Sequence, residues 1–367
     1  MSRSGRPIGG PENRRGLRPR QIGDTMASSP LLIDCHSDII IDVVRRRDAG
    51  ERNVLGRVHL LNLRAGGVGA AVCTVGGDPG VLQPLGPDRP FDGALHLIDL
   101  LEADVAESDG ALEITLTPAA LREAVDRGAF AVVPCLEGAM PLEGSLDRLE
   151  RLIERGVRSI GLVHNTANDL STGIGKGSDG LSALGVEAVE AMNDLGVIVD
   201  VTHVNSEGFW DVVETTRSPI IASHSNASAV HDHPRNLDDA QLKAVGELEG
   251  LVGIVLYAAF VGPRPCTLSQ VLDHADHLLD LLGGDSVGIG ADYIDYAIEQ
   301  TKQELAEQGV AWTDADFEYP EGVSTFSELG NLLPGLESRG HSPACISKVA
   351  GESFLRVWES VEQEARR

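Results

Sequence analysis

Eight short apolar runs rich in β-branched residues recur along almost the whole chain, and this repetition constrains the fold more than any other feature. Most of them are separated by segments whose apolar residues recur at every third and fourth position, as in an amphipathic helix. Strands that alternate with helices predict a parallel sheet, and eight of them predict closure into a (β/α)8 TIM-like barrel of the α/β class. The eight runs span 31–35, 68–75, 130–136, 159–163, 197–202, 219–223, 251–257 and 286–291.

The segments between and after these runs complete the predicted architecture. Helical patterns occupy 91–108, 145–155, 182–195 and 268–282, and three C-terminal helices are expected at 325–338, 342–350 and 352–364. A long charged loop, 293–323, follows the eighth strand and is expected on the catalytic rim. A ninth apolar run, 112–117, alternates polar and apolar residues, which predicts an edge hairpin or a lead-in to a helix near Pro118.

Composition supports one large α/β domain. Of the 367 residues, 42% are hydrophobic but only 4% are aromatic, so the core is built from aliphatic side chains, as in buried parallel strands. We expect one barrel domain over 29–367, preceded by a disordered Arg/Gly/Pro-rich tail at 1–28. Met26 is an alternative start to Met1.

Charge and cysteine usage exclude several classes of partner. A formal charge of −26 argues against nucleic acid and against anionic membrane surfaces, since both bind clustered Lys and Arg. No apolar stretch is long enough to predict a membrane span, and the first 25 residues lack the apolar region of a signal peptide. Five scattered cysteines without a CxxC pair predict reduced thiols and a cytoplasmic location.

Metal-ligand side chains follow four of the predicted strands. His36 and Asp38 end the first, Glu137 follows the third, His203 the fifth and His224 the sixth. Barrel enzymes build their sites at the carboxyl ends of the strands, so these five side chains are expected to meet. Each histidine alone is more often a hydrogen-bonded core residue, but together they predict a metal site.

Five such ligands exceed the needs of one tetrahedral ion and suit two ions that share a bridging carboxylate, for which Glu137 is the candidate. We predict two Zn²⁺ per chain, although the nitrogen and oxygen donor set also admits Mn²⁺, Co²⁺ or Fe²⁺. A hydroxide bridging the two ions would be the nucleophile. Cys135, two residues before Glu137, is expected to be buried packing.

Three further residues at strand ends complete a predicted hydrolytic site. His164, after the fourth strand, is a candidate to polarise the scissile carbonyl or stabilise the oxyanion. Arg235 offers a planar fork to a substrate carboxylate or carbonyl. Asp292, after the eighth strand, is a candidate to carry a proton from the attacking water to the leaving amine. The alternatives are a hydrogen-bonded strand end for His164 and Asp292, and a surface salt bridge for Arg235.

Eight blocks of the sequence, in order from residue 31 to residue 358, resemble the signature blocks of the membrane dipeptidase (renal dipeptidase) family of the amidohydrolase superfamily. They read LIDCHSD, HLLNLRAGGVGA, PCLEGA, GLVHNTAND, VDVTHV, ASHSNASAVHDHPRN, VGIGAD and FLRVW. The resemblance implies a metal-dependent barrel that hydrolyses dipeptides, often with a D-residue at the C-terminal position, and that commonly dimerises. Some members of the family open β-lactam rings.

The resemblance also assigns roles to individual residues. It implies metal binding by His36, Asp38, Glu137, His203 and His224, with Glu137 bridging, and substrate contacts by His164, Arg235 and Asp292. Four places depart from the family pattern and predict an altered pocket wall around an intact metal site. They are Ser37, the small run 71–75, Ile294-Asp295, and Glu352-Ser353 before Phe354.

The sequence therefore predicts a cytoplasmic, homodimeric zinc dipeptidase. The open alternatives are an amidohydrolase acting on an N-acyl amino acid or β-lactam, and a ligand-binding barrel without turnover. A substrate panel separates the first from a dipeptidase, whereas bound metal without any hydrolysis points to the second.

Overall fold

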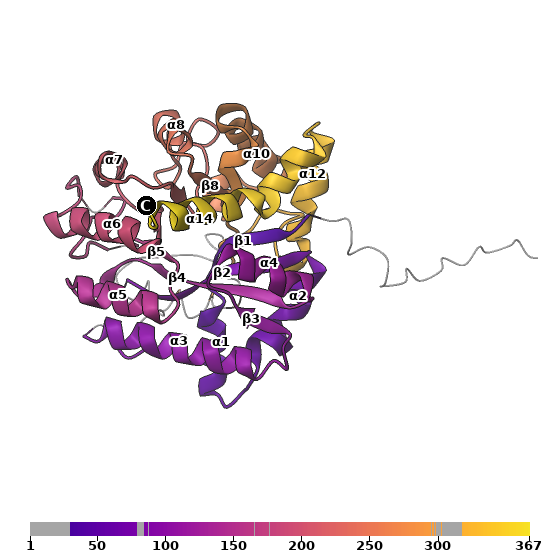
Figure 1. Ribbon diagram of the computed structural model, residues 1–367. Coiled ribbons are helices and arrows are strands. Elements are labelled where there is room, and N and C mark those ends of the chain that lie inside the picture. Colours follow the sequence, from indigo (N-terminus) through magenta and orange to yellow (C-terminus); the bar gives the residue numbers. More distant parts are fainter. Residues whose placement is uncertain are drawn as a thin grey trace, which may run out of the picture.

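Eight parallel strands close into a barrel that helices surround (Figure 1). The computed structural model describes residues 30–78, 84–86, 88–164, 166–175, 177–294, 296, 298, 302 and 318–367. The barrel strands are β1 Leu32–Ser37, β2 Val68–Gly77, β4 Phe130–Glu137, β5 Ser159–Gly161, β6 Ile198–Asp200, β7 Ile220–Ala222, β8 Leu251–Ile254 and β9 Val287–Ile289. The ring closes where β1 pairs with β9 and β2 pairs with β4. The predicted α/β (β/α)8 barrel is confirmed.

The ninth run forms a short extra strand, β3 (Leu112–Ile114), which pairs in parallel with the first half of β4. The expectation of an edge hairpin is therefore wrong, whereas the lead-in to a helix at Pro118 is confirmed. On the same edge of β4, β5 pairs with the second half. Pro134 lies where the β3 pairing ends and the β5 pairing begins, a place where a missing N–H disrupts the ladder least.

Helices follow most of the strands. They are α1 Ile40–Asp48, α2 Leu60–Ala65, α3 Pro90–Ala106, α4 Pro118–Asp126, α5 Leu146–Glu154, α6 Ala183–Leu195, α7 Ser206–Thr215, α8 Asp239–Glu247, α9 Ala258–Val261, α10 Leu268–Leu282, α12 Leu332–Ser338, α13 Pro343–Ser347 and α14 Ser353–Glu364. Single-turn 3₁₀ or π segments are η1 Leu55–His59, η2 Met140–Leu142, η3 Gly284–Ser286, η6 Phe326–Asn331 and η7 Lys348–Glu352. The helix expected over 325–338 is thus divided between η6 and α12.

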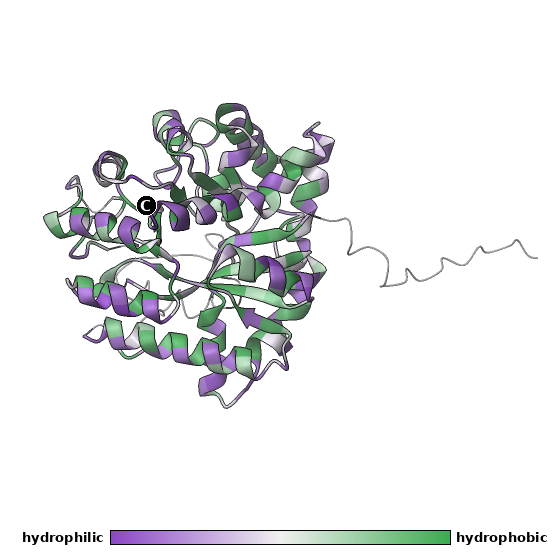
Figure 2. Ribbon diagram, in the orientation of Figure 1, coloured by the Kyte–Doolittle hydropathy of each residue, from purple (hydrophilic) through white to green (hydrophobic). Residues whose placement is uncertain are grey.

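Local sequence explains where several helices begin. Ser182 and Asn205 accept hydrogen bonds from the backbone three residues ahead and cap α6 and α7, and Asp238 forms a capping box with Gln241 at α8. Along the helices apolar and polar residues alternate, whereas the strands are mainly apolar (Figure 2). The apolar helix faces therefore pack on the outside of the barrel.

Helix α14 lies across one end of the barrel (yellow in Figure 1). Its fully buried Phe354 and Trp358 belong to one apolar cluster with Ile33, Ile198 and Leu251, which lie at or next to the beginnings of their strands. The amino-terminal end of the barrel is thereby filled with apolar side chains. The carboxyl ends of the strands are left for polar ones.

Some predicted features lie outside the described residues. They include the tail at 1–28 with Met26, Asp295, and most of the loop at 293–323, so the division into a tail and one domain stays a prediction. Across the described part of the chain, no helix combines the length and apolar character needed to cross a bilayer. All five cysteines are described, and all five are free.

Candidate metal centre

The five predicted metal ligands converge on one point at the carboxyl ends of β1, β4, β6 and β7. Glu137, the last residue of β4, is at the centre, with its Oε1 3.0 Å from His203 Nε2, 3.5 Å from His36 Nε2 and 3.5 Å from His224 Nε2. Asp38 Oδ1 lies 3.6 Å from His36 Nε2. All five side chains are buried. Residues far apart in the sequence therefore form one cluster of nitrogen and oxygen donors.

This cluster has the properties expected of a cation site. His36 Nε2 and Asp38 Oδ1 are buried without a hydrogen-bond partner among the described residues. A buried polar atom left unpaired costs about 1–3 kcal/mol, so these atoms fit a ligand that the protein itself does not supply. The facing Nε2 atoms of His203 and His224 are only 3.0 Å apart. Imidazole nitrogens and carboxylate oxygens form a donor set that suits zinc and other divalent first-row metals.

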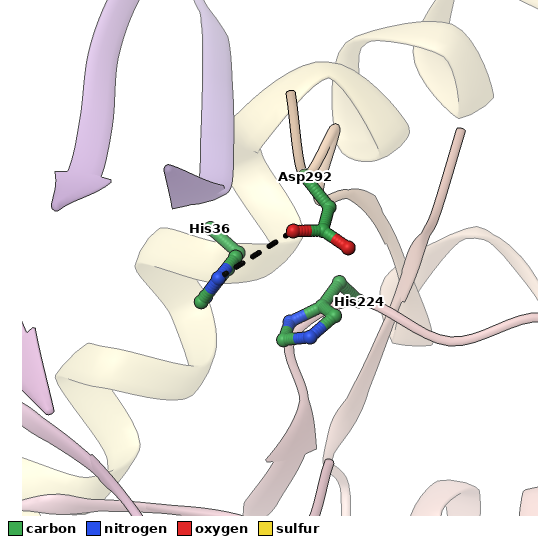
Figure 3. A group of neighbouring side chains, drawn as sticks. All are labelled: His36, His224 and Asp292. Atoms are coloured by element: carbon green, nitrogen blue, oxygen red, sulfur yellow. Dashed lines mark ion pairs between the residues drawn. The ribbon is translucent and has the colours of Figure 1, made fainter. Parts of the chain in front are cut away.

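The three predicted substrate residues surround this cluster. His164 Nε2 lies 3.6 Å from Glu137 Oε1, almost as near as the predicted ligand His36 at 3.5 Å. Figure 3 shows the Asp292 carboxyl group beside the rings of His36 and His224, with Oδ1 3.9 Å from His36 Nε2. His164 lies close enough to Glu137 and His203 to share a metal ion with them. Asp292 lies equally close to His36 and His224. Distance alone therefore does not divide the seven residues into ligands and substrate contacts.

Arg235 reaches the same cluster from the loop after β7. One guanidinium nitrogen, Nη2, lies 3.4 Å from His203 Nε2 and 3.4 Å from the backbone oxygen of His224. The guanidinium carbon stacks 5.3 Å from the centre of the Phe260 ring. This cation–π contact holds the planar fork at the edge of the site, so the alternative of a surface salt bridge does not describe it.

Burial shifts the pKa of the acidic groups upward. It raises the pKa of Glu137 to about 8, assisted by repulsion from Asp38. It likewise raises the pKa of Asp292 to about 7. Each carboxyl group resists ionisation because the site concentrates negative charge away from water. A bound cation would reverse this effect, since it stabilises the ionised form.

The imidazoles divide into two kinds. Burial, with Arg235 and other cationic neighbours, lowers the pKa of His203 and of His224 well below the ordinary value, and burial lowers that of His164 to about 4. Burial also disfavours the charged form of His36, but Glu137 and Asp38 raise its pKa well above the ordinary value. His203 and His224 are therefore neutral, which is the form of imidazole that binds a metal.

Two of the site residues have a left-handed backbone. The φ angle is 69° at His203 and 56° at Asp292. Such angles strain a residue with a side chain, and similar strain is common where a functional group must be aimed. Both residues come just after a strand, where the chain turns the side chain back toward the cluster.

Asp78 was not predicted from the sequence, although it holds two site residues in place. It directly follows β2, is 1% exposed, and accepts hydrogen bonds from the backbone N–H of His164 (2.5 Å) and from Asn168 Nδ2 (3.3 Å). Its own N–H donates to the Glu137 carbonyl. The available signal was an acid at the end of an apolar run, the same signal that identified Glu137.

Two of the departures from the family pattern lie in the barrel wall or beside the metal cluster. The run 71–75 lies within β2 and is buried, so its small side chains pack in the barrel wall. Ser37 is fully buried beside the metal cluster. Cys135 lies in the apolar cluster that α14 completes, which agrees with its expected packing role.

The fold and this donor set together define a barrel hydrolase of the metal-dependent type. A model of the membrane dipeptidase family (peptidase family M19) matches residues 20–311, and the chain belongs to this family. It is a metallodipeptidase.

Two relatives match large parts of this chain. The chain is 30% identical over 290 residues to an uncharacterized protein of Klebsiella pneumoniae, covering 76% of this chain and 99% of that protein. It is 31% identical over 233 residues to an uncharacterized dipeptidase of Schizosaccharomyces pombe, covering 62% of this chain and 52% of the relative.

Solved structures share the fold. A Rhodobacter sphaeroides metallopeptidase bound to a phosphinate mimic of the dipeptide L-Ala-D-Ala superposes with a TM-score of 0.77 at 23% identity, covering 91% of this chain and 100% of that one. The probable dipeptidase PvdM of Pseudomonas aeruginosa also gives 0.77, at 24% identity, covering 91% and 96%.

Proposed function

We propose that this metallodipeptidase uses two divalent ions, zinc in the first instance, held by His36, Asp38, Glu137, His203 and His224. The observation that supports this most directly is the position of Glu137 Oε1, which lies 3.0–3.5 Å from imidazole nitrogens on three different strands. That position suits a carboxylate shared by two ions. When bound, such ions lower the pKa of water toward neutrality and polarise a carbonyl oxygen.

The substrate is a dipeptide whose carboxylate is bound by Arg235. The half-buried guanidinium group lies at the edge of the cluster and keeps its planar face on Phe260, so its N–H groups remain directed into the site. A fork of this kind forms paired hydrogen bonds with a carboxylate. Recognition of a free carboxylate next to the scissile bond favours dipeptides over longer peptides.

Two residues act on the reacting atoms. Asp292 takes a proton from the attacking water and gives it to the leaving amine, a role that suits a carboxyl group beside the rings of His36 and His224 at the edge of the cluster. His164 is neutral near pH 7, because burial lowers its pKa to about 4. A neutral imidazole can donate an N–H to the oxygen of the scissile carbonyl as negative charge develops there.

We further propose that a D-residue is accepted at the C-terminal position. Support comes from the Rhodobacter sphaeroides structure with the same fold, which contains a mimic of L-Ala-D-Ala. Homodimer formation and a cytoplasmic location stay predictions from the sequence.

The proposal is tested by elemental analysis of the purified protein, combined with hydrolysis of matched L-L and L-D dipeptides before and after chelation. We expect about two zinc ions per chain and cleavage that chelation abolishes and zinc restores. His224→Ala should remove metal and activity, whereas His277→Ala should keep both, because His277 pairs with Asp239 on α10 and α8, away from the cluster. A chain without metal that stays inactive when zinc or manganese is added would contradict the proposal. Cleavage of N-acyl amino acids or β-lactams but not dipeptides would change the substrate class.

A further inference from the structure

A chain of four buried side chains runs from the interior of the barrel to the metal cluster. Thr202 Oγ1 donates to Asp200 Oδ1 over 2.6 Å, Ser223 Oγ lies 3.3 Å from Thr202 Oγ1, and His224 Nδ1 lies 2.9 Å from Ser223 Oγ. All four residues are less than 9% exposed. This series of hydrogen bonds joins the end of β6 to the end of β7, the two strands that supply neighbouring imidazoles.

The donors and acceptors have one order in which all three of these contacts are hydrogen bonds. Asp200 Oδ1 also accepts the backbone N–H groups of Thr202 (2.9 Å) and Ser223 (3.1 Å), so it acts as an acceptor throughout. The single hydroxyl hydrogen of Thr202 is therefore used toward Asp200, and Thr202 Oγ1 accepts from Ser223. Since the hydroxyl hydrogen of Ser223 is then used as well, Ser223 Oγ accepts from Nδ1–H of His224.

This order fixes the state of the imidazole. With its hydrogen on Nδ1, His224 presents an unprotonated Nε2 toward Glu137 Oε1 at 3.5 Å and His203 Nε2 at 3.0 Å. A histidine that binds a metal usually donates its other ring N–H to a neighbouring acceptor, which sets the tautomer and the ring orientation. Here the acceptor is a hydroxyl that is itself oriented by a second hydroxyl and a carboxyl group.

We propose that Asp200, Thr202 and Ser223 are positioning residues that hold His224 in the Nδ1–H tautomer and aim its Nε2 at the metal. The inference rests on the proposed metal centre, because it assigns His224 Nε2 as a ligand. The neighbouring Ser225 gives a natural comparison. It is 1% exposed, yet its hydroxyl has no hydrogen-bond partner among the described residues, so a buried serine at this strand end does not have to be paired.

The first test measures Zn²⁺ affinity of the metal-free protein by competition with a chromogenic chelator. We expect Ser223→Ala to weaken binding by about 10- to 100-fold, the usual effect of removing such a partner. Thr202→Val should weaken it by less, Thr202→Ser should bind like the wild type, and Ser225→Ala is the matched control that should not change. If Ser223→Ala does not fold, the comparison of Thr202→Val with Thr202→Ser decides, because valine keeps the shape of threonine without its hydroxyl.

The second test observes the tautomer directly in metal-free protein labelled with ¹⁵N-histidine, by two-bond ¹H–¹⁵N NMR correlation. The His224 signal, assigned by its absence in His224→Gln, should show the Nδ1–H pattern in the wild type and in Ser225→Ala, and should lose it in Ser223→Ala. Equal zinc affinity and an unchanged tautomer in Ser223→Ala would overturn the inference. If the wild type binds no zinc, the result counts against the proposed metal centre. In that case, loss of the Nδ1–H tautomer in Ser223→Ala would still show that Ser223 positions His224.

Discussion

Two groups of acids in this molecule are both buried but have different surroundings. Beside α1 and α3, Asp104 is 0% exposed and accepts hydrogen bonds from Arg47 Nη1 and from the backbone N–H groups of Val54 and Leu55, all within 2.8 Å. At the catalytic rim, Asp38 is 6% exposed, yet its Oδ1 has no hydrogen-bond partner among the described residues and only His36 Nε2 at 3.6 Å as an ion-pair partner. Burial alone therefore says little about what an acid does.

Asp42 and Glu137 show the same difference in their ionisation. Burial alone would raise the pKa of Asp42, but hydrogen bonds from His59, Arg45 and Arg46 outweigh it and hold this pKa well below the ordinary value. Burial raises the pKa of Glu137 to about 8, and the nearby Asp38 raises it further rather than compensating. The first acid is paired by the protein itself and contributes to stability. The second is only partly balanced, by His36 and Arg235, so its pKa stays raised and it is available to a cation.

The largest effect is expected for Glu137→Gln. Removal of the shared ligand should lower kcat/KM on the order of a thousandfold or more, as is usual for residues that act as a unit in a site. The unfolding free energy of the metal-free protein should not fall and should rise near pH 7, because burial raises the pKa of Glu137 to about 8 and this acid must take up a proton on folding, which glutamine need not do. Steady-state kinetics and urea unfolding measure the two quantities. A loss of several kcal/mol in stability would remove the contrast between the two regions.

Asp104→Asn should have the opposite effect, lowering stability while leaving activity nearly unchanged. Breaking a buried, fully hydrogen-bonded ion pair costs about 3 kcal/mol, so the urea midpoint should fall clearly while the activity per folded molecule stays within about twofold. Glu107→Gln is the control on the same arginine, because this partner of Arg47 is 34% exposed and an exposed pair contributes less than about 1 kcal/mol. An inactive but stable Asp104→Asn protein would contradict the assignment of this region to stability.

Zinc should raise the unfolding free energy of the protein only through the metal cluster at the catalytic rim. A free zinc concentration one hundred times the dissociation constant should raise the unfolding free energy of the metal-free protein by about 2.7 kcal/mol. Thermal unfolding with and without zinc measures this gain. We expect it in Asp104→Asn and not in Glu137→Gln, and equal gains in the two variants would show that zinc binds elsewhere.

The smallest effect is a pH dependence at Asp42. Since the folded-state pKa of this acid lies below its unfolded value, its contribution to stability is complete above about pH 4 and is lost as the pH falls through the folded-state pKa. Asp42→Asn should therefore be less stable than the wild type by about 2 kcal/mol near pH 7, and the difference should narrow below about pH 4. Urea midpoints of both proteins from pH 3 to pH 7 give the comparison, and a difference that grows toward low pH would reverse the sign.

The sequence predicted the barrel and the convergence of its ligands because both depend on pattern alone. Apolar runs locate the strands, and once eight parallel strands close, the residues after each run must meet at one rim, as His36 and His224 do. The expectation of an edge hairpin at β3 was wrong, because three residues are too few for a pattern to reveal parallel pairing.

The positioning contacts could not be predicted in the same way. The chain from Asp200 to His224 depends on the register that sets Asp200 opposite Ile221, and on the rotamers of two hydroxyl side chains. Asp78 binds His164 through a backbone N–H, which has no signature in the sequence. The sequence also does not give the distance of each histidine from Glu137. His164 Nε2 and His36 Nε2 lie at nearly the same distance from Glu137 Oε1, although only His36 was predicted to bind the metal.

The pairing of β1 with β9 has a consequence for how the protein folds. It sets Asp34 opposite Ile289, so the ring closes only when the two ends of the barrel sequence meet. Pairings between such distant residues form slowly, because the entropy of a long loop is lost before the contact compensates it. His36 and Asp292 lie just beyond this seam and approach each other only when it is made. The metal-binding cluster is thus complete only when β1 and β9 have paired, and zinc uptake during refolding should report the closure of the barrel itself.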